Sequence, residues 1–279
     1  MLSEQLLQRL APLRLQIHGY AHGGAGGVRR SRSRGSSAEL SDFRDYVPGD
    51  DLRRVDWNAY ARLNRLYVRE YMEEKDSMVS LVLDTSASMA GRLPAMLEYT
   101  QLLACLALQS GDRVRIWPLG GEPSPLFHTR SALPRLDAWL KGLACGGSGN
   151  PAEQVHDLQG LPRGLSFVIT DALTGDIASC LDFLRFRHQE VVLVQLMSPE
   201  ELHPELEGSL RLIDSETGEA LNLTVDADCL SRYRSALDDF FRNLRETCRQ
   251  REIPCLCLDT GLPTGDQMLP MLAAAGLIS

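Results

Sequence analysis

An apolar run leads directly into a polar loop in the segment Val79-Ser80-Leu81-Val82-Leu83-Asp84-Thr85-Ser86-Ala87-Ser88. The first five of these residues have the length and apolar character of a strand that is buried on both faces, as in a parallel sheet. A helix is predicted over residues 94–109, because apolar residues recur there at helical spacing. A buried strand that is followed by an amphipathic helix is the repeating unit of an α/β fold.

Strands and helices alternate through the rest of the chain. The sequence pattern predicts strands at 113–118, 165–170, 191–196 and 255–258, and helices at 133–143, 151–158, 176–187, 228–251 and 266–275. Two more predicted strands, 210–213 and 220–225, flank a polar turn that contains Gly218, which predicts a hairpin. From residue 79 onward we therefore expect a mostly parallel sheet with helices on both faces.

The first 78 residues lack this alternation. A helix is predicted over residues 4–17, followed by a Gly-, Ser- and Arg-rich stretch at 22–35 that cannot build a core. Residues 36–78 are dense in charge and aromatic side chains, with a turn at 48–51. We predict two regions: an N-terminal region of residues 1–78 that packs on an α/β domain of residues 79–279.

Composition narrows the class of protein. The chain has 279 residues and a net charge of -8, which argues against a dedicated nucleic-acid-binding protein. Its seven cysteines include no C-x-x-C pair, which favours reduced thiols in the core over a zinc site. Neither a secretion signal nor an apolar stretch of membrane-spanning length is evident in the sequence. We therefore expect a soluble, cytoplasmic protein.

Two predicted strands end in an aspartate: Asp84 follows the first strand and Asp171 follows the strand at 165–170. If the two strands are parallel neighbours, both carboxylates lie at the carboxyl edge of the sheet. Ligands of open α/β sheets bind at this edge, near the topological switch point. Ser86, Ser88 and Ser148, the last in a Gly-rich loop, add hydroxyl oxygens. Such a set suits Mg²⁺ or Mn²⁺, with water completing an octahedron. Asp84 as a helix cap or turn residue is the alternative interpretation.

These residues resemble the metal-ion-dependent adhesion site of von Willebrand factor A domains. That motif has D-x-S-x-S after the first strand, a Thr in a middle loop and an Asp after the fourth strand. Asp84, Ser86, Ser88 and Asp171 match it, and Ser148 stands where the motif has Thr. The resemblance implies a von Willebrand factor A-like, Rossmann-like fold. It also implies a metal whose last ligand is an acidic side chain of a partner protein.

A second resemblance covers residues 39–62, which are similar to the signature of the bacterial "domain of unknown function 58" family. That signature, R-x-Y-x-P-G-D-D-x-R-x-I-D-W, precedes a von Willebrand factor A-like domain, and many relatives carry membrane helices ahead of it. This chain resembles the family's short soluble branch. The matching residues are Arg44, Tyr46, Pro48, Gly49, Asp50, Asp51, Arg53, Asp56 and Trp57.

The family resemblance also implies a partner. Its members are typically paired with MoxR-type AAA+ ATPases, which implies an adaptor in the assembly, maturation or metallation of other proteins. For the P-G-D-D segment itself, two interpretations stay open. It is either an ion-pair network that pins the segment to the main domain, with Trp57 as an apolar anchor, or a docking surface for the ATPase.

An enzyme is the alternative function, as a metal-dependent hydrolase or phosphatase that uses Asp84. Haloacid-dehalogenase phosphatases also place a nucleophilic Asp after the first strand, but they need a second Asp two residues later as general acid. Ser86 occupies that position and cannot protonate a leaving group at neutral pH. The sequence also lacks a G-x-S-x-G elbow and a Walker lysine motif. We therefore predict a metal-dependent protein-binding adaptor that is not an enzyme.

Overall fold

A computed structural model describes residues 2–17, 40–71, 77–146, 150–173, 176–215 and 217–279. The chain divides into two compact units, one formed by Met1–Gly19 with Ser77–Ser279 and the other by Tyr20–Asp76. The end of the smaller unit lies close to the predicted boundary at residue 78. The first nineteen residues are grouped with the larger unit, which differs from the predicted N-terminal region of residues 1–78.

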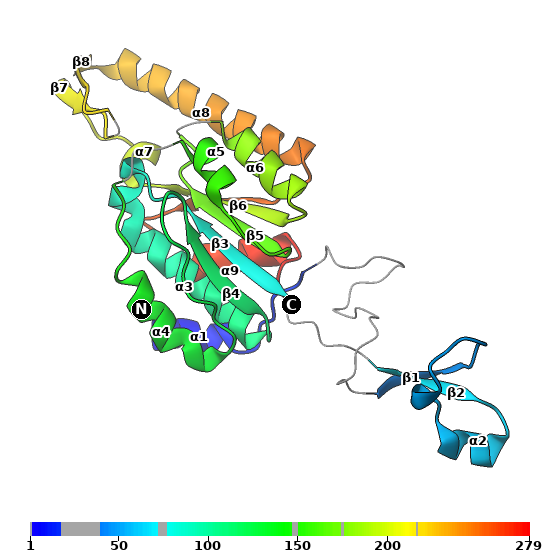
Figure 1. The fold of residues 1–279 in the computed structure, drawn as a ribbon. Helices are drawn as coiled ribbons and strands as arrows, with labels where there is room; N and C mark the ends of the chain where they lie inside the picture. Colours follow the sequence, from blue (N-terminus) through cyan, green and yellow to red (C-terminus); the bar gives the residue numbers. More distant parts are fainter. Residues whose placement is uncertain (1, 18–39, 72–76, 147–149, 174–175, 216) are drawn as a thin grey trace. The chain divides into compact units, whose positions relative to one another are not determined.

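A five-stranded sheet forms the centre of the larger unit (Figure 1). Its strands are β3 (Met78–Leu83), β4 (Arg113–Pro118), β5 (Leu165–Thr170), β6 (Glu190–Met197) and β9 (Cys255–Asp259). They lie in the order β4-β3-β5-β6-β9, and every neighbouring pair is parallel. The predicted α/β fold with a mostly parallel sheet is confirmed. The chain leaves β3 toward β4 and later returns to the other side as β5, so the topological switch point lies between β3 and β5.

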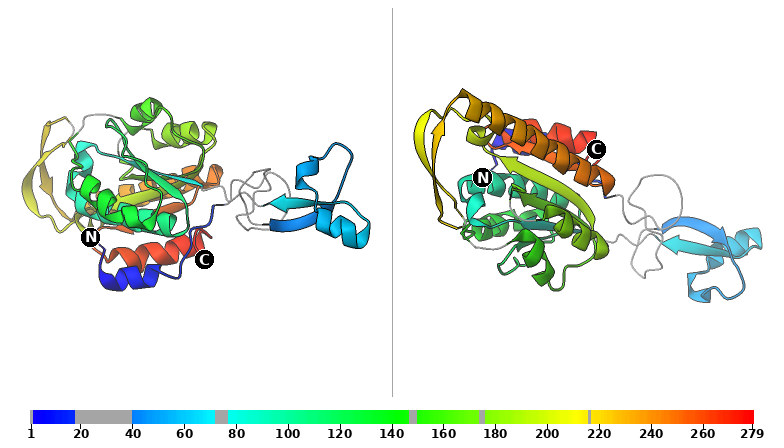
Figure 2. Two further views of the ribbon diagram at one scale, coloured as in Figure 1. Left: turned by 60° about the horizontal axis from the view of Figure 1, so that its bottom comes forward. Right: turned by 90° about the horizontal axis from the view of Figure 1, so that it is seen from above.

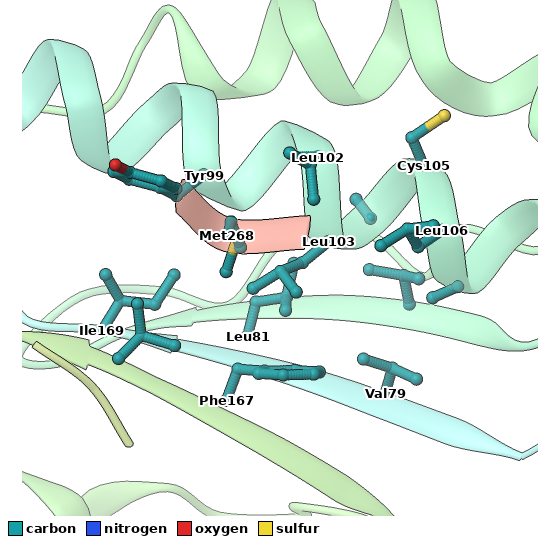
Figure 3. Close-up of a cluster of buried hydrophobic side chains, with 14 of the residues drawn as sticks. Val79, Leu81, Tyr99, Leu102, Leu103, Cys105, Leu106, Phe167, Ile169 and Met268 are labelled. Atoms are coloured by element: carbon teal, nitrogen blue, oxygen red, sulfur yellow. The ribbon is translucent and has the colours of Figure 1, made fainter. Parts of the chain in front are cut away.

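Helices cover both faces of this sheet (Figure 2). On one face lie α1 (Glu4–Leu10), α3 (Leu93–Gln109), α4 (Leu133–Leu140) and α9 (Thr264–Ala274); on the other lie α5 (Pro151–Gln154), α6 (Ile177–Phe186) and α8 (Ala227–Gln250). Alternate residues of β3 point to opposite faces of the sheet. Leu81 lies in the hydrophobic core on the face of α3, here the first core, and Val82 lies in the core on the face of α6. Figure 3 shows the first core, with Leu81 and Phe167 of the sheet beneath Leu103.

The N-terminal segment packs on the larger unit. Leu10 and Leu15 are fully buried in its core. Leu15 also forms an antiparallel bridge with Ile278 near the other end of the chain. The predicted helix over residues 4–17 is too long, because α1 ends at Leu10. Pro12 follows that end, and proline has no N–H to donate to the carbonyl group four residues earlier, so the helical hydrogen-bonding pattern stops there.

The predicted hairpin is present as β7 (Gly208–Ile213) and β8 (Ala220–Val225), which pair antiparallel. The short helix α7 (Pro199–Leu202) precedes it, and the 24-residue helix α8 follows. Asp226 caps α8 by accepting a hydrogen bond from the backbone of Cys229. Over the described part of the chain, no helix has both the length and the apolarity to cross a membrane.

The smaller unit contains elements that the sequence did not predict. An antiparallel pair, β1 (Leu40–Asp45) and β2 (Tyr67–Tyr71), encloses a 3-10 helix at Leu52–Arg54 and the helix α2 (Trp57–Leu63). Val55 and Val68 form a bridge, and each is 4% exposed. Charged residues interrupt the apolar pattern of both strands, which is why their strand character is weak in the sequence.

Candidate metal site at the switch point

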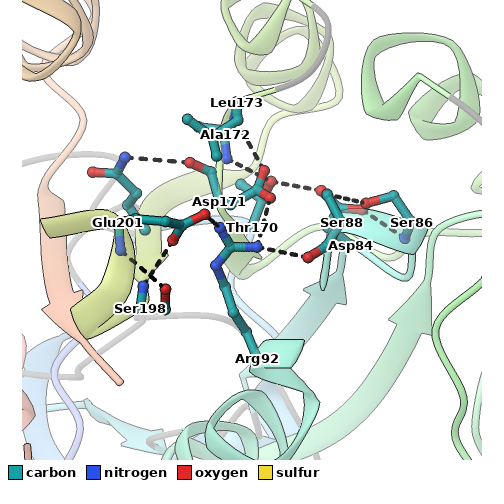
Figure 4. Close-up of polar contacts among 11 residues, drawn as sticks. Asp84, Ser86, Ser88, Arg92, Thr170, Asp171, Ala172, Leu173, Ser198 and Glu201 are labelled. Atoms are coloured by element: carbon teal, nitrogen blue, oxygen red, sulfur yellow. Dashed lines mark hydrogen bonds and ion pairs between the residues drawn. The ribbon is translucent and has the colours of Figure 1, made fainter. Parts of the chain in front are cut away.

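The two aspartates that follow β3 and β5 lie together at the switch point (Figure 4). Asp84 and Asp171 are both 0% exposed. The backbone N–H of Asp84 donates to the carbonyl of Ile169 at 2.9 Å, which holds the two strand ends side by side. Parallel pairing of β3 with β5 therefore brings the two carboxylates to one edge of the sheet.

The loop after β3 adds two hydroxyl groups to these carboxylates. Ser86 Oγ lies 3.1 Å from Ser88 Oγ, and the Ser86 N–H donates to Asp84 Oδ1 at 3.0 Å. Ser88 is hydrogen-bonded to the carboxylate of Asp171. The structure thus brings four of the five predicted ligands into one cluster. The fifth, Ser148, lies outside the described residues.

Thr170 is a member of the cluster that the sequence reasoning missed. Its hydroxyl donates to Asp84 Oδ2 at 2.6 Å and accepts from the backbone N–H of Ala172 at 3.0 Å. Both oxygens of the Asp84 carboxylate therefore accept a hydrogen bond, one from Thr170 and one from Ser86. One sequence signal could have identified Thr170 as a partner of Asp84. Thr170 directly precedes Asp171 and therefore lies at the end of the same strand, β5.

Arg92, which the sequence reasoning also missed, brings a buried cation to the cluster. Its Nη1 lies 3.0 Å from Asp171 Oδ2 and 2.6 Å from the carbonyl oxygen of Ser88. Its Nη2 pairs with Glu201. The side chains of Arg92 and Asp171 are 6% and 0% exposed, so their ion pair is shielded from water. Sequence spacing gives no sign that a residue after the D-x-S-x-S loop folds back onto Asp171.

Glu201 connects the cluster to the next elements of the chain. Its carboxylate accepts from the backbone N–H of Ser198 at 2.8 Å, and Ser198 Oγ accepts from the Glu201 N–H at 3.3 Å, forming a capping box at the start of α7. The hydroxyl of Tyr233, in α8, donates to the carbonyl oxygen of Glu201 at 2.8 Å. Arg92 thus links Asp171 to both α7 and α8.

Opposing effects act on the carboxyl group of Asp171. Burial raises the pKa of Asp171 above its ordinary value, and the nearby charge of Asp84 raises it further. The Leu173 N–H, Arg92 and Ser88 act in the opposite direction. Two buried carboxylates this close together need positive charge nearby, and Arg92 supplies one such charge.

The donor set fits a small hard cation. Asp84, Ser86, Ser88 and Asp171 offer only oxygen, the ligand that Mg²⁺ and Mn²⁺ prefer. Neighbouring ligands of an octahedral Mg²⁺ lie about 3 Å apart, given metal–oxygen distances of about 2.1 Å, and the two serine hydroxyls are separated by 3.1 Å. Among the described residues, no three His, Cys, Asp or Glu side chains form a metal-binding group. A metal here would therefore rely on hydroxyl and water ligands as well as on the carboxylates.

The P-G-D-D segment of the smaller unit forms a tight turn. The Asp50 N–H donates to the carbonyl of Val47 at 3.0 Å, and the Asp50 carboxylate accepts from the Val47 N–H at 2.9 Å. Gly49 has a φ of 107°. Pro48 followed by a residue of positive φ is the composition of a type II turn, which explains the glycine at this position.

The other acids of this segment cap helices. Asp51 accepts from the Arg53 N–H at the start of the 3-10 helix, and Asp56 accepts from the N–H groups of Asn58 and Ala59 at the start of α2. Capping of this kind stabilises the first turn of a helix. The acids therefore have local structural roles in the smaller unit.

Trp57 lies at the start of α2 in the smaller unit. It is 56% exposed, and its ring meets that of Tyr60 edge-on at 6.3 Å between centroids. It belongs to a seven-residue helix in which no side chain is buried. The remaining predicted residues lie nearby: Tyr46 donates its backbone N–H to the carbonyl of Leu66, and Arg44 lies in β1, with its side chain outside the described part.

Comparisons with known proteins establish the family. The chain is 26% identical over 242 residues to uncharacterized proteins of Mycobacterium bovis and Mycobacterium tuberculosis, covering 81% of this chain and 76% of those proteins. Among solved structures it is similar to the conserved hypothetical protein BatB from Bacteroides thetaiotaomicron, with 12% identity and a TM-score of 0.43 over 72% of this chain and 98% of that one. An aerotolerance-related membrane protein from Bacteroides fragilis shows 14% identity and a TM-score of 0.40 over the same shares. The family described as "Protein of unknown function DUF58" matches residues 42–240, more than half of the chain, which therefore belongs to that family.

Proposed function

We propose that this protein is a cytoplasmic, divalent-metal-dependent adaptor that binds other proteins and works with a MoxR-type AAA+ ATPase in their assembly or maturation. One observation carries the proposal. The D-x-S-x-S loop and Asp171 converge at the switch point of the sheet, with two fully buried carboxylates and two hydroxyls 3.1 Å apart. This arrangement supports the likeness to the metal-ion-dependent adhesion site of von Willebrand factor A domains.

The chemistry of the site favours recognition. Asp84, Ser86, Ser88 and Asp171 would hold Mg²⁺ or Mn²⁺, and the metal would attract a carboxylate of a client protein. A phosphatase that used Asp84 as nucleophile would need a general acid two residues later, and Ser86 occupies that position. Leu173, two residues after Asp171, is 46% exposed and offers apolar contact surface beside the site.

Calorimetric titration of EDTA-treated protein with Mg²⁺ and Mn²⁺ tests the metal site. We expect binding to the wild type and loss of binding in Asp84→Asn, which keeps the size of the side chain but removes its charge. Glu122→Gln removes one exposed charge elsewhere and is the matched control. Equal affinity in wild type and Asp84→Asn would exclude the site. Metal-dependent phosphatase turnover that Asp84→Asn abolishes would instead support the enzyme alternative.

Capture of a purified MoxR-type ATPase tests the partner. If the metal face binds the ATPase, EDTA and Ser86→Ala should each weaken capture, because both disturb the metal. If the P-G-D-D segment binds it, Asp50→Arg should abolish capture and EDTA should have no effect. Asp50→Asn is the control for that variant, because it keeps an acceptor for the Val47 N–H. Capture that withstands all of these changes rejects both surfaces.

A further inference from the structure

The hairpin formed by β7 and β8 has one face made of leucine. Leu210 lies directly opposite Leu223, and Leu212 lies directly opposite Leu221. Because side chains alternate along a strand and opposite residues share a face, these four residues form one surface, here called the leucine face. The other face carries Ser209, Arg211, Asn222 and Thr224, with Ile213 beside the turn.

The leucine face lacks a covering layer over much of its area. Leu212 and Leu221 are 42% and 61% exposed, whereas Leu210 and Leu223 are half-buried. In the described part of the chain, β7 and β8 pair only with each other. Figures 1 and 2 show the hairpin extending away from the sheet and helices of the larger unit. An isolated two-stranded hairpin is marginal in water, so a partner that covered this face would also stabilise the hairpin itself.

The charge around the hairpin indicates which partner fits. Residues 200–228 contain nine Asp and Glu residues and one basic residue, Arg211. Nine negative charges and one positive charge give this segment a net charge of -8, equal to that of the whole chain, so the rest of the chain is neutral on balance. The leucine face therefore lies within the most acidic part of the protein. A second copy would bring the same acids to the interface, which disfavours self-association, whereas a basic partner would be attracted.

We propose that the leucine face docks a basic amphipathic segment of a partner protein, such as a helix with leucine-like residues on one side and Lys or Arg along its edges. The contact needs no metal and therefore differs from the carboxylate contact of the proposed function. The hairpin follows α7 directly in the sequence, and Glu201 of α7 pairs with Arg92 of the candidate metal site.

Fluorescence anisotropy with a labelled synthetic helix of leucine and lysine, arranged amphipathically, tests the proposal. We expect saturable binding to the full-length protein, unchanged by EDTA and weakened by added salt. Two control peptides, one with every lysine replaced by glutamate and one with the same residues in scrambled order, should bind at least about tenfold more weakly, a difference of roughly 1.4 kcal/mol.

Two sets of variants locate the contact. The double variant Leu212→Ser with Leu221→Ser should weaken binding about tenfold or more, whereas Ile213→Ser, on the opposite face and 65% exposed, should change it less than about twofold. Glu219→Lys should also weaken binding, and Glu122→Lys, the same charge change after β4, should not. Because these positions are at the surface, circular dichroism should show that all variants fold.

Three results would overturn the proposal. The first is unchanged peptide affinity in both the leucine variant and Glu219→Lys. The second is equal binding of the glutamate and scrambled peptides. The third is a wild-type protein that does not bind the peptide but either forms a dimer, detected by sedimentation, or binds phosphatidylcholine vesicles, with the leucine variant abolishing that association. In that last case a second copy or a lipid surface is the occupant. Because the proposed docking needs no metal, a negative result for the peptide does not argue against the metal site. A negative result for the metal site does not argue against the docking.

Discussion

Replacing Arg92 by leucine removes the buried cation that faces Asp171. The two groups lie 3.0 Å apart, and their side chains are 6% and 0% exposed. Removing one partner of a buried ion pair destabilises a protein by roughly 3–5 kcal/mol, because the other charge remains buried without compensation. Glu201 is 28% exposed and can be hydrated, and Asp171 still accepts from the Leu173 N–H. We therefore expect the lower end of the range, about 3 kcal/mol.

Urea denaturation in EDTA measures this loss, with Arg92→Lys as the charge-preserving control. We expect Arg92→Lys to lose less than Arg92→Leu, because an ammonium group still faces Asp171. A free energy of unfolding for Arg92→Leu within about 0.5 kcal/mol of the wild type would refute the counter-ion role. Equal losses in the two variants would refute it as well, because the charge would then be irrelevant.

The same variant reports on competition between Arg92 and a metal. If Mg²⁺ binds Asp171, it supplies the positive charge that Arg92→Leu has lost, so the variant should bind Mg²⁺ more tightly than the wild type. At a free Mg²⁺ concentration of 100 times its Kd, binding adds about 2.7 kcal/mol to the free energy of unfolding. The same concentration should stabilise the wild type less. Equal stabilisation of both proteins would show that the guanidinium and the metal do not compete.

Three further predictions test the fold. Burial raises the pKa of Tyr99 from 10.0 to about 12, so the folded state keeps a proton that the unfolded state loses. Stability should then fall as the pH rises between these values, by up to about 3 kcal/mol, and Tyr99→Phe should remove this pH dependence in paired urea titrations. In Gly164→Ala, the added Cβ would lie 2.0 Å from the carbonyl oxygen of Met78. Denaturation should show a loss of about 1–3 kcal/mol, against almost none for Gly91→Ala, where nothing lies within 4 Å. Asp56→Ala removes the cap of α2, which should cost about 1 kcal/mol locally and speed amide hydrogen exchange in that helix; unchanged exchange would contradict the capping role.

The sequence predicted those parts of the molecule whose chemistry is local. Apolar runs such as 79–83 and 165–170 identify buried strands, because their length and lack of charge suit no exposed element. Asp84 and Asp171 could be placed together because each ends such a strand. Arg92 and Glu201 could not be found in this way. Their contact depends on where a long side chain folds back and on how α7 approaches, and neither is encoded in residue spacing.

The smaller unit shows the same limit. The sequence left open whether Asp50, Asp51 and Asp56 belong to an ion-pair network or to a docking surface, and it did not show that each also accepts a hydrogen bond from a nearby backbone N–H. An aspartate in a turn can pair with a cation and can also accept from the backbone, and the local backbone geometry decides whether it does the second. The 56% exposure of Trp57 could not be predicted either, because residue spacing does not show whether an aromatic side chain at the start of a helix is buried.

The bridge between Leu15 and Ile278 has a consequence for synthesis on the ribosome. These residues are 263 positions apart. At about 5–20 residues per second, the partner of Leu15 is made roughly 13–53 s after Leu15 itself. The smaller unit, Tyr20–Asp76, is complete long before that time and can fold while the larger one is still being translated. Until β9 and α9 emerge, the apolar residues of α1 cannot make their contacts with α9 and remain partly uncovered. During this period the nascent chain is most exposed to aggregation.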